Sequence, residues 1–258
     1  MNIFKGLYNY RELLKTSVKK EIRGKYKNSF LGVLWSFLNP LLQILVYAIV
    51  FPLIMKNNER SYVVFLCCGL IPWTFFGATI TRSAATMIEN GNIIKKVYFP
   101  REILPLSICI SEGVNFLIST IIILAFVLFN GIGLTYYILF YPIIVIVQFL
   151  LVLAISLFVS SITVYIRDLQ HLIGVALQLL FYATPIVYNA NTVKGSGFEW
   201  VLAINPMTYI IEAYRNIFYN QVMPDIKSLL ILGGILIIAC VVGYLVFNKL
   251  QKGFAEEL

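Results

Sequence analysis

The residues able to do chemistry in this chain gather in one short charged loop. The segment NGNIIKKVYFPREILPLS, residues 90–107, places Lys95, Lys96, Arg101 and Glu102 between two long apolar runs. Apolar side chains with a charged rim are typical of a small protein docking surface. Packing of the loop against a membrane face is the alternative, and the residue types alone leave both interpretations open.

The same loop predicts a short helix followed by the start of a longer one. Residues 90–98 carry apolar side chains at helical spacing, and Pro100 ends this pattern. An early proline and an acid in the first turn, here Glu102, are typical of a helix N-terminus. We expect the apolar side chains of the short helix to share one side: Ile93, Ile94, Val97 and Tyr98.

The sequence offers no catalytic or metal site. A phosphate-binding loop of the form G-x-x-x-x-G-K-[ST] does not occur in the chain, so we do not expect the chain to bind and hydrolyse ATP by itself. The single histidine, His171, follows Arg167 and Asp168 in a loop, where a solvated role is expected. The four cysteines fall inside apolar runs without metal-ligand spacing, so neither a zinc site nor a disulfide framework is predicted.

The composition indicates a membrane protein. Hydrophobic residues make up 60% of the 258 residues and charged residues only 12%, whereas soluble domains carry about 25% charge. A spanning helix needs about 20 mostly apolar residues. We therefore predict an all-α membrane protein with six transmembrane helices, at residues 34–53, 62–80, 104–129, 134–164, 172–187 and 229–247.

The basic residues predict the orientation of these spans. Cytoplasmic loops hold an excess of lysine and arginine, and a cytoplasmic N-terminus puts 15 of the 20 such residues inside. Both termini are then cytoplasmic. The net charge of +8 follows from this bias and from anionic lipid, so nucleic acid is not an expected partner. The basic residues left outside are Lys56, Arg60, Lys194, Arg215 and Lys227.

We predict that residues 1–258 form one domain, with a basic N-terminal segment, a six-span bundle and a short tail. The segment is residues 1–30, the bundle 31–248 and the cytoplasmic tail 249–258. Residues 11–27 repeat apolar side chains every four positions between lysines and arginines, which predicts an amphipathic helix in the inner membrane surface. A basic leader that only fixes topology is the alternative.

Polar residues inside the spans indicate contact with protein or a channel rather than lipid. The first span contains Asn39, Pro40 and Gln43, which lipid would not satisfy. Glu112 lies two turns into the third span, and we predict that it faces the bundle interior and bonds to a neighbouring helix. A proton relay is the alternative, but a paired mid-membrane carboxylate does not accompany it.

A loop of about forty residues joins the fifth and sixth spans, and Asn205-Pro206 divides it. Apolar residues recur at helical spacing on both sides, and proline disfavours helix at the residue before it. We predict two short helices in a re-entrant or interfacial pair; a soluble extracellular loop is the alternative.

Aromatic side chains in the spans are candidates for a sugar conduit. Tyrosine and tryptophan offer an apolar face with a hydrogen-bonding edge, although they also gather at membrane interfaces as a matter of course. The candidate channel residues are Trp35, Phe37, Tyr47, Trp73, Phe181, Tyr182 and Tyr188.

Four segments resemble one family. KKVYFPREILPLS is similar to the cytoplasmic loop of permease subunits of ABC-2 type exporters, which move O-antigen, capsule polysaccharide and teichoic acid. YKNSFLGVLWSFLNPLLQILVY resembles the entry into the first span of these subunits. VYIRDLQHLIGVALQLLFYATPIVYN resembles their fourth-to-fifth connection, and NPMTYIIEAYRNIF their outer re-entrant segment. Together the four segments cover most of the chain in the expected order.

The resemblance implies a permease that exports a lipid-linked polysaccharide across the bacterial cytoplasmic membrane. It implies a homodimer docked on two copies of a separate ATPase, which bind ATP and Mg, with no cofactor in this chain. Export of a drug or small lipid is the alternative within the same architecture. A membrane transferase would need a cluster of acidic or histidine residues, and the sequence shows no such cluster. A stand-alone transporter would need internal repeats or intramembrane ion ligands, and the sequence shows neither.

The resemblance also assigns roles by position, with the first and fifth spans lining the channel. The ATPase-coupling residues are Asn90, Asn92, Ile93, Lys95, Lys96, Tyr98, Phe99, Pro100, Arg101 and Glu102, with Arg167 and Asp168 in a second, smaller contact. The outer gate, within residues 198–220, contains Asn205, Pro206, Tyr209, Glu212 and Arg215.

Overall fold

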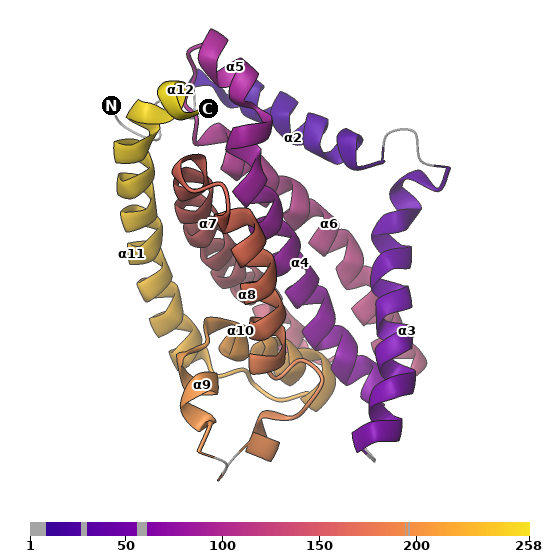
Figure 1. Cartoon of the computed structure of the whole chain (residues 1–258). Helices are drawn as coiled ribbons and strands as arrows, with labels where there is room; N and C mark the ends of the chain where they lie inside the picture. Colours follow the sequence, from indigo (N-terminus) through magenta and orange to yellow (C-terminus); the bar gives the residue numbers. More distant parts are fainter. Residues whose placement is uncertain (1–8, 27–29, 56–60, 194, 196) are drawn as a thin grey trace.

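Every regular element in the described part of the chain is helical. The computed structural model describes residues 9–26, 30–55, 61–193, 195 and 197–258, and no strand occurs among them (Figure 1). Lys56, Arg60 and Lys194, three of the basic residues predicted to face outward, lie outside these residues, as do residues 1–8 and 27–29 of the predicted N-terminal segment.

Four helices in the described ranges are long and apolar enough to cross a membrane. The longest has 28 residues, or about 42 Å, against about 30 Å of hydrocarbon. The other two predicted spans are shorter apolar helices. The four long helices are α4 (Tyr62–Glu89), α6 (Ile103–Phe129), α7 (Tyr141–Tyr165, preceded by η2, Tyr136–Phe140) and α11 (Ile226–Leu250), and the shorter ones are α3 (Trp35–Met55) and α8 (Leu169–Ala183).

The bundle is built around α4. This helix packs against α6 and α7, and α11 covers the far side of α7. The helices α3 and α8 each pack against α4 from other directions. Figure 1 shows α2 (Arg11–Tyr26), α5 (Gly91–Lys96) and α12 (Phe254–Glu257) together at one end of the bundle, called here the α5 end. The opposite end, the α10 end, holds α9 (Glu199–Ile204) and α10 (Pro206–Arg215).

Two helices do not end where the predicted spans end. The helix α4 continues nine residues beyond Ile80, because residues 81–89 contain neither glycine nor proline and interrupt only the hydrophobicity. The helix α8 ends at Ala183 rather than residue 187, because Pro185 disfavours helix at Thr184, whose ψ of 138° is extended. The Ile186 side chain that follows is buried in non-helical chain.

A buried glutamine ties three helices together at the centre of the bundle. Gln148 of α7 donates from Nε2 to the carbonyl oxygen of Pro72 in α4 at 2.8 Å. Its Oε1 accepts from the Tyr214 hydroxyl of α10 at 2.9 Å. Both side chains are fully buried, so the two hydrogen bonds satisfy polar groups that would otherwise be costly in the apolar interior.

Side-chain caps fix the helix starts at the α10 end. Asn205 accepts at Oδ1 from the Met207 backbone N–H at 3.0 Å, and Pro206 occupies the first turn of α10. Asp225 caps α11 by accepting from the Ser228 backbone N–H at 3.1 Å and from the Ser228 hydroxyl at 2.6 Å. These hydrogen bonds from Ser228 lower the pKa of Asp225 below its ordinary value, because they favour the charged carboxylate.

Candidate functional site

The helix predicted in the charged loop is shorter than expected. It spans Gly91–Lys96, whereas the prediction extended to Tyr98. Val97 already has extended dihedrals, φ −130° and ψ 133°. The β-branched Val97 and the constraint that Pro100 places on Phe99 both favour extended chain here. Tyr98 and Phe99 therefore belong to an extended link between α5 and α6.

The prediction that four apolar side chains share one side of α5 is wrong. Ile94 is 3% exposed and points into the protein, while Ile93 is 47% exposed. Neighbouring residues on a helix point about 100° apart, and here the buried cluster receives Ile94 while Ile93 points away from it. Tyr98, at 86% exposed, stands out furthest. The outward surface, called here the α5 patch, consists of Asn92, Ile93, Lys95, Lys96, Val97 and Tyr98.

The other predicted coupling residues of this loop support the patch from behind. Asn90 is buried; its amide donates to the Thr86 carbonyl at 2.8 Å and its Oδ1 accepts from Lys20 Nζ at 3.2 Å. Phe99 is buried in a small cluster with Ile94. The helix α6 begins directly after Pro100, Arg101 and Glu102, which form the turn that leads into it.

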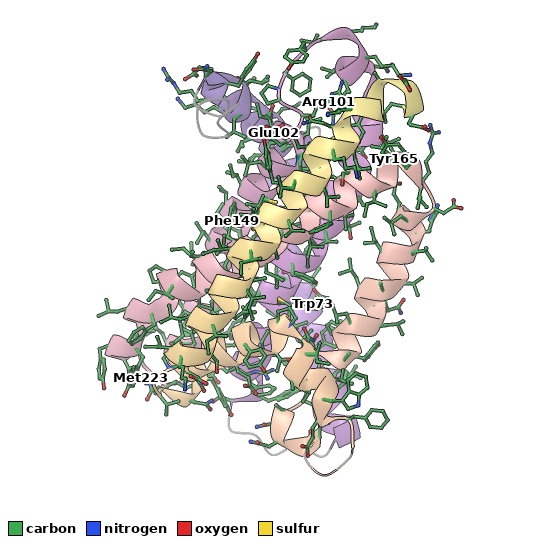
Figure 2. All side chains as sticks on the ribbon, turned by 90° about the vertical axis from the view of Figure 1, so that its left-hand side faces the viewer. Trp73, Arg101, Glu102, Phe149, Tyr165 and Met223 are labelled. Carbon is green, nitrogen blue, oxygen red and sulfur yellow. The ribbon has the colours of Figure 1, made fainter. Side chains whose placement is uncertain are left out.

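Arg101 is directed at the C-terminal tail of the chain rather than outward. Its guanidinium donates to the backbone carbonyl oxygen of Gln251 and lies 5.7 Å from the ring centre of Phe254. Figure 2 shows Arg101 and Glu102 beside the tail at the α5 end, far from Met223 at the α10 end. The tail comprises η5 (Gln251–Gly253) and α12.

The tail joins the charged loop to the second predicted contact. The Phe254 ring is fully buried against Phe247, at 5.7 Å between centroids, and near Tyr165 at 6.2 Å. Arg167 lies exposed in the turn before α8 and donates to the Glu257 carbonyl at 3.2 Å. Asp168, also exposed, precedes α8. This bridge was not predicted from the sequence, although a phenylalanine among mostly polar tail residues could have signalled it.

The prediction that Glu112 bonds to a neighbouring helix is confirmed, and Glu112 bonds to residues of two neighbouring helices. It is 3% exposed, and its carboxylate accepts from Lys25 Nζ of α2 at 3.0 Å and from Arg82 of α4 at 2.5 Å. Arg82 also donates to Glu21 of α2. One carboxylate therefore fixes the amphipathic helix to two helices of the bundle. Asn115 adds a hydrogen bond to Glu112 at 3.3 Å.

Comparison with known proteins places these features in a family. Residues 12–219 match the model of the ABC-2 type transporter family. The chain belongs to this family. An O-antigen export system permease protein, RfbA, from Myxococcus xanthus is 32% identical over the full length of both chains. A protein of the same name from Klebsiella pneumoniae is 36% identical over 96% of this chain and 95% of its own. The polysialic acid transport protein KpsM of Escherichia coli is 23% identical over 81% of this chain and 80% of its own.

In this ABC-2 family member, four of the seven candidate channel aromatics form one cluster. Tyr47 of α3 stacks on Phe181 of α8 at 5.8 Å between ring centroids, and Trp73 of α4 meets Phe181 edge-on at 5.7 Å. Tyr182 joins at 5.3 Å from Phe181. Trp73 and Phe181 are buried within the single chain, and Tyr182 is exposed. The cluster thus joins α3, α4 and α8 and leaves one aromatic ring on the surface.

The remaining three aromatics make no ring contact with this cluster among the described residues. Trp35 is at the start of α3 beside a polar cavity. Phe37 packs partly buried against the core. The Tyr188 hydroxyl donates to the Tyr182 carbonyl at 3.1 Å.

The predicted outer-gate residues hold the corner between α9 and α10 against the end of α8. Asn205 donates to the Thr184 hydroxyl at 2.7 Å, and the Tyr209 hydroxyl donates to the Ala203 carbonyl at 2.8 Å. Arg215 is buried, donates to the Ile186 carbonyl at 2.6 Å and lies 3.5 Å from the Phe65 ring centre.

Two further gate candidates, Pro206 and Glu212, lie in α10, which begins at this corner. Pro206 opens α10, and Glu212 lines a cavity of about 290 Å³ beside Arg215. The five residues are therefore neighbours at the α10 end.

Proposed function

We propose that the chain is the transmembrane permease subunit of an ATP-driven exporter that moves a lipid-linked polysaccharide across the bacterial cytoplasmic membrane. The observation that carries this proposal is the similarity over the full length of the chain to permeases named for O-antigen export. The polysaccharide transport protein among the relatives supports the same substrate class. O-antigen, capsule polysaccharide and teichoic acid all belong to it.

The proposed architecture has six spans, with α3 and α8 crossing the membrane beside the four long helices. In the proposed assembly, a second copy of the chain and neighbouring lipid complete the surroundings of these two helices. The excess of basic residues near the α5 end supports a cytoplasmic location for that end and for both termini. The α10 end then faces outward, and the corner held by Asn205 and Arg215 is the proposed outer gate.

The proposed energy input is the α5 patch. A separate ABC ATPase, which binds ATP and Mg, would receive this patch in a cleft, with Arg167 and Asp168 in a second contact. Ile94 and Phe99 anchor α5 in a small buried cluster, and this anchoring supports α5 acting as a rigid lever. ATP binding would close two ATPase subunits, move the two levers and shift the two permease subunits against each other to admit the glycan.

The exposed aromatic on the α5 patch provides the sharpest test. Tyr98 is 86% exposed, so Tyr98→Ala removes a docking side chain without opening a cavity in the permease. We expect the variant to insert normally, to lose co-purification with the ATPase encoded beside it, and to lose export. Exposed aromatic anchors at interfaces commonly cost 2 kcal/mol or more, or about thirtyfold in affinity.

The control is Tyr136→Ala, which removes another exposed tyrosine, 69% exposed, at the α10 end. It should assemble with the ATPase as the parent does. A Tyr98→Ala protein that binds the ATPase and exports glycan like the parent would refute coupling through this patch. Export of a drug or small lipid by the complex, with no glycan exported, would replace the substrate assignment with the alternative.

A further inference from the structure

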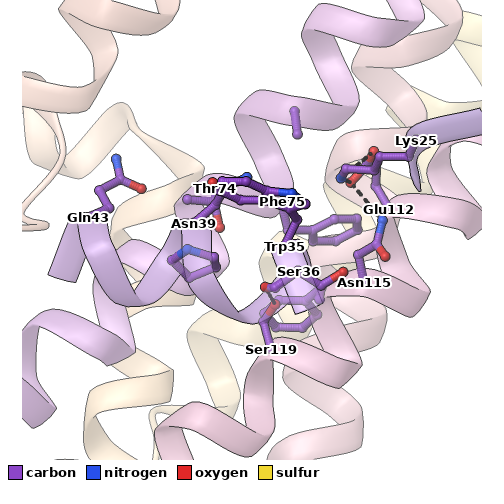
Figure 3. A pocket seen from close by; sticks show the side chains of 13 residues that line it. Lys25, Trp35, Ser36, Asn39, Gln43, Thr74, Phe75, Glu112, Asn115 and Ser119 are labelled. Atoms are coloured by element: carbon purple, nitrogen blue, oxygen red, sulfur yellow. Dashed lines mark hydrogen bonds and ion pairs between the residues drawn. The ribbon is translucent and has the colours of Figure 1, made fainter. Parts of the chain in front are cut away.

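A polar cavity of about 250 Å³ lies between α3, α4 and α6 near the α5 end. Figure 3 shows its lining, with the ion pair between Lys25 and Glu112 at one side. Two helices, α3 and α6, each contribute three polar side chains at helical spacing toward it, and α4 contributes one. The polar lining residues are Ser36, Asn39 and Gln43 from α3, Thr74 from α4, and Glu112, Asn115 and Ser119 from α6, with Lys25 from α2.

Two amides in this lining have no protein partner among the described residues. Asn39 is exposed and Gln43 is half-buried within the single chain, and neither side chain makes a hydrogen bond to the described residues, although both stand in a mostly apolar helix. An unpaired amide in a membrane span is costly, so such residues usually mark a ligand pathway or a wet cavity. Each amide offers two donors and an acceptor oxygen, which matches sugar hydroxyl groups that both donate and accept.

The charge and the lining residues of the cavity limit the class of ligand that it can bind. Lys25 and Glu112 neutralise each other at 3.0 Å, so the cavity offers no unbalanced charge to an ionic ligand. Trp35 and Phe75 supply aromatic surface against which an apolar ring face can pack. The volume is below the range of about 300–1,000 Å³ for drug-sized ligands, which suits one ring rather than a chain of rings.

We propose that this cavity is a binding site for a single neutral sugar ring, held by Asn39 and Gln43 and packed against Trp35. The proposal rests on the proposed function, since a polysaccharide exporter would present such rings to the permease. It places a sugar site inside one subunit, on the α3 face turned toward α4 and α6, apart from the cluster around Phe181.

Trp35 allows a direct binding measurement, because the chain has only three tryptophans. Substituting Trp73→Phe and Trp200→Phe leaves Trp35 as the single reporter. The purified protein is titrated with D-glucose, D-mannose, D-galactose and N-acetyl-D-glucosamine at millimolar concentrations, with sorbitol as an acyclic control. We expect at least one hexose, but not sorbitol, to change the Trp35 fluorescence in a saturable manner.

Variants of the two amides test the assignment of the contacts. Asn39→Leu with Gln43→Leu should weaken the apparent affinity about tenfold or more, because two hydrogen bonds are lost. Leucine is better tolerated than an amide in a span, so insertion should persist. Gln178→Leu makes the same change on an exposed position of α8, outside the cavity, and should bind like the parent.

Two results would overturn the sugar site: no hexose response beyond that of sorbitol, or unchanged binding by the double leucine variant. A parallel export assay separates this failure from that of the proposed function. A parent protein that exports polysaccharide while the cavity binds no hexose removes only the cavity assignment. A parent that exports no polysaccharide removes the proposed function, whatever the fluorescence shows.

Discussion

Truncating Phe254 should release the C-terminal tail from the α5 end. The ring is 0% exposed, and Phe→Ala at such sites costs about 3–5 kcal/mol. Burial of about 150–250 Å² at about 25 cal/mol per Å² gives about 4–6 kcal/mol as an upper bound. Both routes agree near 4 kcal/mol, which is roughly a thousandfold change in the ratio of docked to undocked tail.

The loss should be local, because η5 and α12 are short elements at the α5 end that can detach without unfolding the bundle. Hydrogen exchange over residues 251–258 measures it, since the Leu258 N–H donates to the Phe254 carbonyl at 3.1 Å within this tail. We expect exchange there to accelerate strongly in Phe254→Ala and the α4 core to stay protected.

Glu256→Ala changes an exposed residue of the same helix and is the control. Exchange in Phe254→Ala as slow as in the parent would show that the hydrogen bonds from Arg101 and Arg167 hold the tail alone. The reasoning from ring burial would then be refuted.

Two further substitutions test the interior. Gln148→Leu should lower the free energy of unfolding by about 1–3 kcal/mol in a denaturation assay, because it leaves the Tyr214 hydroxyl unpaired; adding Tyr214→Phe should recover part of this, and no recovery would argue against the bridge. Glu112→Gln should lower the free energy that holds α2 on the bundle by about 1–3 kcal/mol. This range is below that for a fully buried ion pair, because Lys25 is one-third exposed and solvent screens its charge. Faster hydrogen exchange over residues 11–26 would reveal the loosening of α2. The control, Glu89→Gln on the surface, should leave this exchange unchanged. Equal exchange rates in the two variants would contradict the view that Glu112 holds α2 to the bundle.

Periodicity and composition predicted the helices well where the apolar pattern was long. The amphipathic helix, the long spans and the break at Pro206 all occur at or near their predicted places. The end of α4 was missed because hydrophobicity marks the membrane rather than the helix, and a helix can continue in water when no residue breaks it. The early end of α8 could have been predicted from Pro185, but the apolar residues after Pro185 led to a longer predicted span.

The α5 patch was harder to predict, because its geometry depends on contacts between residues that are distant in sequence. The pattern around α5 could not show that Ile94 faces inward, since the buried cluster that receives it includes Phe247 and Phe254 from the other end of the chain. For the same reason Arg101, predicted as an interface residue, turns toward the tail. Glu112 was predictable because a lone carboxylate in a span needs a partner, but its two partners were not.

The contacts that hold the tail have a consequence for its evolution. Arg101, Arg167 and the Tyr165 hydroxyl all donate to backbone carbonyls, those of Gln251, Glu257 and Leu250. Main-chain oxygens are the same whatever side chain follows, so most tail positions are free to drift. A few are restricted: Phe254 by its burial, Leu258 by packing against the same cluster, and Gly253 because a Cβ there would lie 2.5 Å from the Tyr165 oxygen. Related chains could therefore exchange nearly the whole tail sequence and still close the same bridge, so long as a glycine and an aromatic residue stand side by side.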